Sequence, residues 1–185
     1  MGLPKETGRY TYADYCTWDD DVRWELIDGV PRAMSPSPGQ KHQSILGQLH
    51  LQFGTYLRGK PCKVFLSPAD VRLNPDGADD TVVQPDLFVV CDHTRLDGRA
   101  CVGPPDLVIE ILSPSTMRYD YSTKLHLYKR AGVREYWIVD PASCSVQVFL
   151  FQGSSQLAKT YTRSEQKVPV GILPGFAVDL TDVFE

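Results

Sequence analysis

The stretch Pro104-Pro-Asp-Leu-Val-Ile-Glu-Ile-Leu-Ser113 is the part of this chain that decides its fold. It predicts a buried β-strand, because a near-continuous apolar run of this length is typical of a strand covered on both faces. Among its aliphatic side chains it carries one carboxylate, Glu110. An unpaired buried charge would cost several kcal/mol, so such a group is normally paired, protonated or bound to a metal. A second acid, Asp86 in Gln84-Pro-Asp-Leu-Phe-Val-Val90, is placed in the same way about one strand earlier. Two strands that each place an acid in one interior predict a metal site.

The elements around this strand indicate an α/β domain with a mixed sheet. Residues 23–34 predict a hairpin, because Asp28-Gly29 is among the strongest two-residue turn signals. Residues 41–57 have apolar side chains at helical spacing, so they predict a helix. We expect a short helix or turn in residues 10–20, a second long helix over 118–131, and strands over 62–73, 81–90, 107–112, 135–140, 144–151 and 157–162. The second long helix is predicted to be a crossover, which makes the strands on either side of it parallel neighbours.

Length and composition limit the class of protein. With 185 residues, 42% hydrophobic and 23% charged, the chain is expected to form a single domain over residues 1–185. It has no apolar run long enough for a membrane span and no signal-peptide pattern, so a cytoplasmic location is expected. A net charge of −4 argues against coating nucleic acid through bulk charge, though not against binding it in a local groove.

The cysteines give no sign of a structural framework. There are five of them, scattered along the chain and never spaced Cys-x-x-Cys. We therefore expect small core residues in a reducing cytosol, and neither disulfides nor a zinc site.

Three side chains are the main candidates for chemistry. Asp86 and Glu110 offer hard oxygen ligands, which suit Mg²⁺ or Mn²⁺ better than zinc. The expected apolar stripe of the crossover helix consists of Tyr121, Leu125 and Tyr128. Lys124 borders this stripe and could lean toward the end of the Glu110 strand. The alternative for Lys124 is an exposed ion pair with Asp120, four residues earlier, and helical geometry alone leaves the two alternatives open.

Three further polar residues are weaker candidates. Glu25, in the hairpin, is either a third acid at the metal site or part of a solvated strand face. His42, at the start of the first long helix, either reaches the mouth of the site or is simply a polar residue at a helix start. Asp106 follows a second proline on the face of Glu110, and it is either a rival ligand or a cap where the strand begins.

Several motifs resemble the Uma-two family of bacterial proteins. The resemblance is carried by Val108-Ile-Glu-Ile-Leu-Ser-Pro-Ser-Thr116, by Asp120 and Lys124, by Glu135-Tyr-Trp-Ile-Val-Asp-Pro141, and by Glu25-Leu-Ile-Asp-Gly29 nearer the start. It implies a restriction-endonuclease-like fold, with a mixed central β-sheet flanked by helices and an N-terminal β-hairpin.

That family is similar to the PD-(D/E)xK nucleases, and the similarity implies roles for particular residues. Asp86 would be the aspartate of the PD motif and Glu110 the second acid, and the two would bind the metal. The pattern wants lysine two residues after the second acid, on the same strand face. That position holds Leu112, and relatives of this kind are thought to supply the lysine from the following helix, which points to Lys124.

The sequence thus favours a metal-dependent endonuclease that hydrolyses phosphodiester bonds of DNA, with Mg²⁺ or Mn²⁺ as cofactor. The alternative is a catalytically silent nucleic-acid-binding or accessory protein that retains the nuclease fold, prompted by Leu112 and by the acidic net charge. A homodimer is expected, because cutting two antiparallel strands favours two-fold symmetry.

Overall fold

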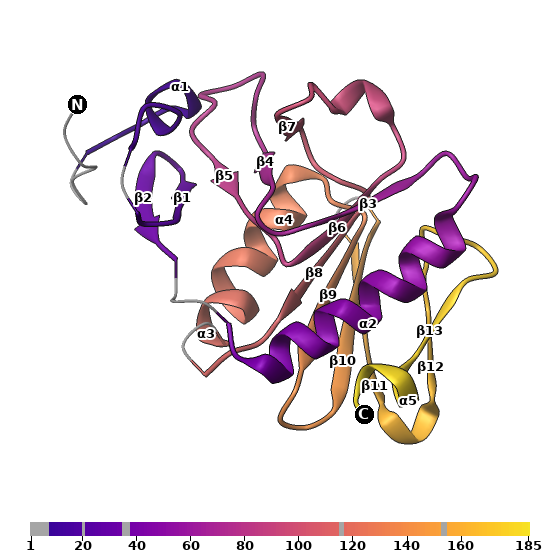
Figure 1. Cartoon of the computed structure of the whole chain (residues 1–185). Helices are drawn as coiled ribbons and strands as arrows, with labels where there is room; N and C mark the ends of the chain where they lie inside the picture. Colours follow the sequence, from indigo (N-terminus) through magenta and orange to yellow (C-terminus); the bar gives the residue numbers. More distant parts are fainter. Residues whose placement is uncertain (1–7, 20, 35–37, 115–116, 153–154) are drawn as a thin grey trace.

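The computed structural model describes residues 8–19, 21–34, 38–114, 117–152 and 155–185. A six-stranded sheet forms its centre, in the order β11-β10-β9-β8-β6-β3 (Figure 1). The strands are β3 (Lys63–Leu66), β6 (Leu87–Val90), β8 (Leu107–Ile111), β9 (Glu135–Asp140), β10 (Ser145–Gln152) and β11 (Ser155–Thr162). β8 and β9 pair in parallel and the other neighbours are antiparallel, so the predicted mixed sheet and crossover are confirmed.

A second, five-stranded sheet lies beside the first, in the order β2-β1-β5-β4-β7. Its strands are β1 (Trp24–Ile27), β2 (Val30–Ala33), β4 (Asp70–Arg72), β5 (Val82–Val83) and β7 (Ala100–Val102). The hairpin of β1 and β2 turns at Asp28 and Gly29, which both have positive φ, as the sequence predicts.

The two long strands expected over 62–73 and 81–90 are each broken in two. The chain leaves the large sheet between β3 and β4 at Pro68, which follows a cis peptide bond, and returns to it between β5 and β6 at Pro85. Proline has no backbone N–H to donate to a sheet ladder, so the interior strands β4 and β6 begin only after Pro68 and Pro85. Both crossings fall at the junction of the two sheets, next to Asp86.

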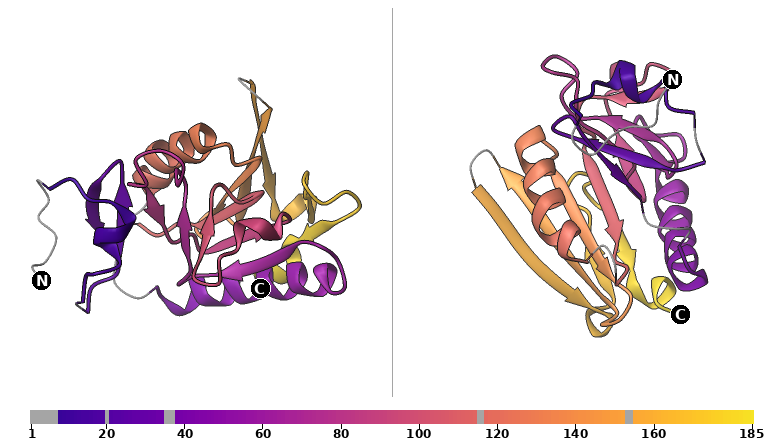
Figure 2. Two further views of the ribbon diagram at one scale, coloured as in Figure 1. Left: turned by 90° about the horizontal axis from the view of Figure 1, so that it is seen from above. Right: turned by 90° about the vertical axis from the view of Figure 1, so that its left-hand side faces the viewer.

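Helices cover both faces of the large sheet (Figure 2). On one face, α2 (Gln40–Leu57) buries Leu49 and Phe53 against the sheet residue Trp137. The short helix α5 (Leu180–Val183) and the ribbon of β12 (Lys167–Pro169) and β13 (Ala177–Asp179) complete this layer. The remaining short elements are α1 (Tyr12–Tyr15), η1 (His93–Arg95) and η3 (Arg163–Glu165).

The crossover covers the opposite face in three pieces. They are α3 (Met117–Tyr119), a π-helical turn η2 (Asp120–Lys124) and α4 (Leu125–Ala131), which ends at Gly132 in the left-handed conformation. Tyr121 was expected on the buried stripe, but it is 39% exposed, whereas Lys124 is only 5% exposed. The π turn explains the difference, since it changes the helical register just before α4.

The expectation about cysteines was wrong for one pair. Cys62 and Cys91 form a disulfide between the ends of β3 and β6. Lys63 pairs with Val90 across these antiparallel strands. Cys62, which precedes Lys63, therefore lies opposite Cys91, which follows Val90. Spacing along the chain does not show which strands become neighbours. Cys16, Cys101 and Cys144 are free thiols.

Among the described helices, none is long and apolar enough to cross a membrane. Residues 153–154 and the motif residues 115–116 lie outside the described residues. β10 and β11, on either side of residues 153–154, pair in antiparallel register.

Candidate active site

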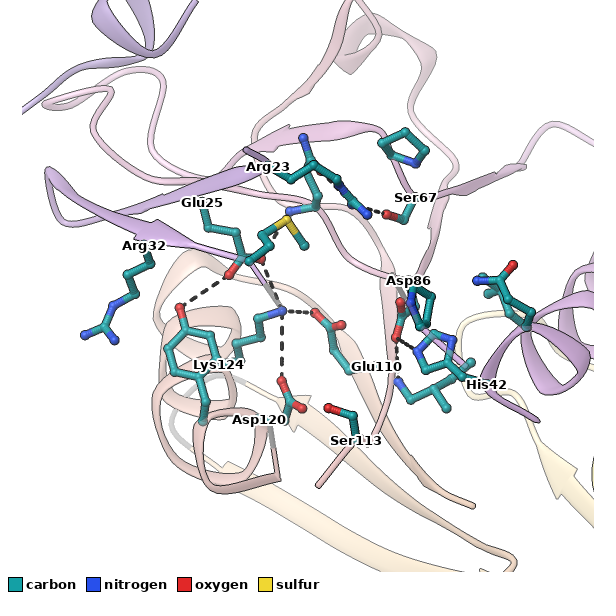
Figure 3. A pocket seen from close by; sticks show the side chains of 18 of the residues that line it. Arg23, Glu25, Arg32, His42, Ser67, Asp86, Glu110, Ser113, Asp120 and Lys124 are labelled. Atoms are coloured by element: carbon teal, nitrogen blue, oxygen red, sulfur yellow. Dashed lines mark hydrogen bonds and ion pairs between the residues drawn. The ribbon is translucent and has the colours of Figure 1, made fainter. Parts of the chain in front are cut away.

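A cavity of about 770 Å³ opens at the junction of the two sheets (Figure 3). All five residues singled out as catalytic candidates line it, namely Glu25, His42, Asp86, Glu110 and Lys124. They come from β1, α2, the segment before β6, β8 and the end of η2. The fold therefore brings together side chains that are as much as 99 residues apart, from 25 to 124.

The two predicted metal ligands lie on neighbouring strands. β6 and β8 are antiparallel with Leu87 opposite Ile109, so Asp86, one residue before β6, lies opposite Glu110. The Ile111 backbone N–H donates to Oδ2 of Asp86 at 2.8 Å. His42 Nε2 lies 3.1 Å from the same oxygen. These contacts fix the orientation of the Asp86 carboxylate toward the cavity.

His42 holds Asp86 through one ring nitrogen only. Within the described part of the chain, its Nδ1 is buried and has no hydrogen-bond partner. A buried ring N–H without an acceptor is costly, whereas an unprotonated nitrogen there is less so. The neutral tautomer with the proton on Nε2, donated to Asp86, therefore fits this environment best.

Glu110 is buried at the floor of the cavity, on the face of the sheet that the crossover covers. Its Oε1 accepts hydrogen bonds from Lys124 Nζ at 2.8 Å and from the Tyr128 hydroxyl at 2.7 Å. Lys124 Nζ also lies 3.2 Å from Oε1 of Glu25 and 3.9 Å from Oδ1 of Asp120. Of the two alternatives for Lys124, the buried one is correct, and Asp120 is buried beside it.

In this cluster three buried carboxylates, those of Glu25, Glu110 and Asp120, surround the single ammonium of Lys124. Burial raises the pKa of Glu110 to about 8, with Lys124 opposing the shift and Asp86, Asp120 and Glu25 adding to it. Burial alone would lower the pKa of Lys124, but the Glu110, Glu25 and Asp120 carboxylates outweigh it and hold that pKa well above its usual value. Lys124 is therefore an ammonium, and the site gains stability from any added positive charge.

Glu25 belongs to the cavity and not to a solvated strand face. It is 4% exposed, and its Oε1 also accepts a hydrogen bond from the Gln84 backbone N–H at 3.3 Å. The Tyr119 hydroxyl donates to its other oxygen at 3.5 Å. Glu25 thus links the small sheet to Lys124 on the crossover.

Two residues of the site were not among the candidates. Asp120 and Tyr128 flank Lys124 at four-residue spacing, and both turn inward with it. Tyr128 was expected on the apolar stripe of the crossover, and it is buried. For Asp120 and Lys124 the sequence left open whether they face solvent or the protein.

Two other positions are structural. Leu112, where the nuclease pattern has lysine, is 5% exposed and packs in the core beneath the crossover. Asp106 is not a ligand at this cavity, because its carboxylate accepts from the Cys91 backbone N–H at 2.8 Å and pairs with Arg134.

The donors fit a hard divalent cation that keeps part of its water shell. The described residues contain no ready-made group of three or more His, Cys, Asp or Glu ligands. Asp86 and Glu110 each have one carboxylate oxygen, Oδ1 and Oε2, that accepts no hydrogen bond within the described chain. Both side chains line the cavity, so a cation that enters it meets them there. Mg²⁺ is commonly bound by one or two carboxylates together with waters and substrate phosphates.

Comparisons with known proteins identify the family of this chain and relatives with its fold. A crystal structure described as a "putative nuclease belonging to DUF820" from Anabaena variabilis has the same fold, with a TM-score of 0.77, 20% identity, and coverage of 95% of this chain and 97% of that one. An uncharacterized protein of Synechocystis sp. is 29% identical over 174 residues, which are 90% of this chain and 88% of the relative. The Uma2 family, described as "Putative restriction endonuclease", matches residues 11–181. The chain therefore belongs to the Uma2 family.

Proposed function

We propose that this protein is a metal-dependent endonuclease that hydrolyses phosphodiester bonds of DNA. One observation carries the proposal: two carboxylates from adjacent strands lie in one cavity with a buried lysine ammonium, and each has an oxygen that accepts no hydrogen bond from the described residues. Family membership supports the nuclease class. The choice of DNA as substrate is part of the proposal.

In this proposal Asp86 and Glu110 hold Mg²⁺ or Mn²⁺. When bound, such an ion supplies Lewis-acid polarisation of a phosphate oxygen and lowers the pKa of a coordinated water. The protein's own part is positioning. His42 and the Ile111 backbone N–H orient Asp86, and Tyr128 orients Glu110.

Lys124 serves in place of the lysine missing at Leu112. Its ammonium lies 2.8 Å from Glu110, so it is near the place where a phosphate oxygen and an attacking water would meet. A positive charge held there stabilises negative charge that develops on the phosphate and orients the water. Glu25 and Asp120 keep the ammonium charged and in place.

Nicking of supercoiled plasmid tests this proposal, with Mg²⁺, Mn²⁺ or a chelator present. We expect nicking that requires the metal, and a loss of about 10²–10³-fold in Glu110→Gln and Lys124→Met, the size seen when one charge-stabilising group is removed. Asp182→Asn and Lys159→Met make the same chemical changes at exposed positions on α5 and β11 and should leave the rate unchanged. Full activity in Glu110→Gln would contradict the proposed site.

One observation favours the alternative of a silent nucleic-acid-binding protein. Lys124 is held by three carboxylates, and the usual lysine position is an apolar core residue. This alternative predicts DNA retention without cleavage in any divalent metal, and equal retention by the wild type and Glu110→Gln.

The finer expectations about assembly and place in the cell belong to the same proposal. A homodimer acting in the cytoplasm would place two cavities on the two strands of a duplex. Sedimentation of the purified protein, alone and with a blunt duplex, measures whether it is a homodimer. A strictly monomeric protein in both samples would contradict it.

A further inference from the structure

A second, smaller pocket of about 250 Å³ has aromatic walls. Trp18 and Trp24 line it with ring centroids 5.9 Å apart at an interplanar angle of 72°. Tyr15 extends the wall, with its ring centroid 5.3 Å from that of Trp18. All three rings are partly exposed, and Val22 beside them is 45% exposed. The pocket therefore offers accessible aromatic surface to a flat ligand.

This pocket adjoins the candidate active site. Arg23 and Gln84 line both cavities, so they form the wall between them. The Arg23 guanidinium donates to the side chains of Gln84 at 2.7 Å and Ser67 at 2.6 Å. Gln84 in turn donates to the Tyr15 hydroxyl at 3.1 Å and to Asp70 at 2.9 Å. This chain of hydrogen bonds fixes the wall, so a ligand that extends past Arg23 reaches from one cavity into the other.

The charge of the small pocket is opposite to that of the active site. Its described lining includes the guanidinium groups of Arg23 and Arg99 and no carboxylate. Within the described part of the chain, neither guanidinium takes part in an ion pair. Arg99 is also exposed. Arginine binds phosphate through its planar fork of donors, and it stacks on flat rings.

Aromatic walls flanked by two arginines that make no ion pair with the described residues fit a nucleotide. Single-stranded nucleic acids bind through aromatic side chains on which bases stack, in grooves whose positive charge follows the backbone. The volume lies below the roughly 300–1,000 Å³ of sites for drug-sized ligands, so it suits a single base. A paired base in a duplex does not present its face to such a pocket, because it is stacked within the helix.

We propose that this pocket binds one unpaired nucleobase of the DNA strand whose phosphodiester enters the active-site cavity. The base stacks on the face of Trp18 and meets Trp24 edge to face, and Arg23 and Arg99 contact the phosphates on either side of it. The inference rests on the proposed function for its substrate class. It adds that the protein prefers a strand with an unpaired base next to the cleavage point.

Binding in a chelator tests the pocket independently of catalysis. The probes are a labelled single-stranded oligonucleotide and a blunt duplex, followed by fluorescence polarisation. Trp18→Ala should weaken single-strand binding about 5- to 150-fold, the range that stacking of one base supports. Trp18→Phe should retain most of the affinity. Leu157→Ala, at a side chain that is 59% exposed on β11, is the matched control and should change nothing.

Arg99→Ala is the second variant, because an exposed arginine can be removed without disturbing the fold. It should weaken single-strand binding and reduce the slope of log affinity against log salt by about 0.7, the value for one phosphate contact on a single strand. Duplex binding should be unchanged in both Trp18→Ala and Arg99→Ala.

Intrinsic fluorescence gives a direct readout of stacking. The chain has three tryptophans, and Trp137 is fully buried in the core. The single strand should quench the fluorescence saturably, and most of the quenching should be lost in Trp18→Ala.

The possible outcomes separate this inference from the proposed function. Metal-dependent plasmid nicking without quenching overturns the pocket and leaves the nuclease. Quenching that depends on Trp18, without nicking in any metal, supports the pocket and counts against the nuclease. A Trp18→Ala variant that changes sedimentation but not oligonucleotide binding would show that the pocket is an interface between protein copies, and this would overturn the inference.

Discussion

Glu110 and Lys124 show how the buried charge in the strand is accommodated. The carboxylate is not isolated, because Lys124 and Tyr128 both donate to it. It is also not neutralised, because Glu25 and Asp120 share the same ammonium. A buried pair in excellent geometry roughly balances its desolvation, but a surplus buried charge does not. The surplus is the physical reason to expect either a bound proton or a bound cation at Glu110.

Stability should therefore fall with rising pH when metal is absent. Burial raises the folded-state pKa of Glu110 from 4.5 to about 8, so the folded protein binds the proton more tightly than the unfolded chain. This contribution is fully present below the unfolded pKa and is lost as pH rises through the folded pKa. Urea denaturation in a chelator between pH 5 and 9 should show the decline. In Glu110→Gln the curve should be flatter, and an equal slope in both proteins would contradict the assignment.

Metal binding should strengthen over the same range of pH. A ligand must lose its proton to bind a cation, so binding at pH 7 should release a proton from Glu110. Calorimetric titration with Mn²⁺ in two buffers of different ionisation enthalpy measures this release. Affinity should rise with pH and level off above about 8. Affinity that does not vary between pH 6 and 8.5 would show that Glu110 is not a ligand.

At the scale of elements, the crossover decides which side chains reach the site. The Leu125 backbone N–H donates to the Asp120 carbonyl, a π-type bond that spans five residues. Single π turns inside α-helices are frequent at functional sites, and here the turn spans the residues from Asp120 to Lys124. α4 then packs on the sheet through Leu127 and Tyr128, which fixes the end of η2 above Glu110.

The end of the crossover offers a clean test of local backbone conformation. Gly132 has φ of 92°, and a Cβ there would meet only Pro104 at an ordinary distance of 3.8 Å. Gly132→Ala should therefore lower the free energy of unfolding by about 1–2 kcal/mol through backbone strain alone. Gly47→Ala is the matched control in the middle of α2. A Cβ at Gly47 would meet no atom within 4 Å apart from its chain neighbours and the backbone of the helix itself.

The control substitution should raise stability by about 0.5–1 kcal/mol, because alanine is the better helix former. Chemical denaturation of both variants measures the two effects. Equal changes of the same sign would contradict the left-handed cap.

At the scale of the whole molecule, the disulfide closes a long loop across the junction of the sheets. Cys62 and Cys91 are 29 residues apart, and the enclosed segment includes β4, β5 and Asp86. In the chain-entropy account, a cross-link of this length stabilises the fold by about 3–4 kcal/mol. Cys62→Ser, or reduction of the oxidised protein, should lower the free energy of unfolding by that order. Cys144→Ser, at a free thiol, is the control.

Intact mass before and after alkylation counts the thiols directly. The oxidised protein should react at three cysteines and the reduced protein at five. Five reactive thiols in the non-reduced, unfolded protein would contradict the disulfide.

Sequence determined the central part of this protein. The apolar run around Glu110 gave the buried strand, Asp28-Gly29 the hairpin, and the spacing in residues 41–57 the helix α2, because each of these signals is local. The motifs from Glu25 to Asp140 indicated the family, and the pairing of Asp86 with Glu110 followed from two strands that each carry a buried acid.

Only the tertiary structure decided the rest. Strands that break at Pro68 and Pro85 to join a second sheet depend on pairings between distant segments, as does the disulfide of Cys62 and Cys91. Whether Lys124 faced solvent or Glu110 depended on a π turn, which small changes in packing create and no local periodicity reveals. Local signals specify elements, but the charge surplus at the site arises from four chain segments that meet only after folding.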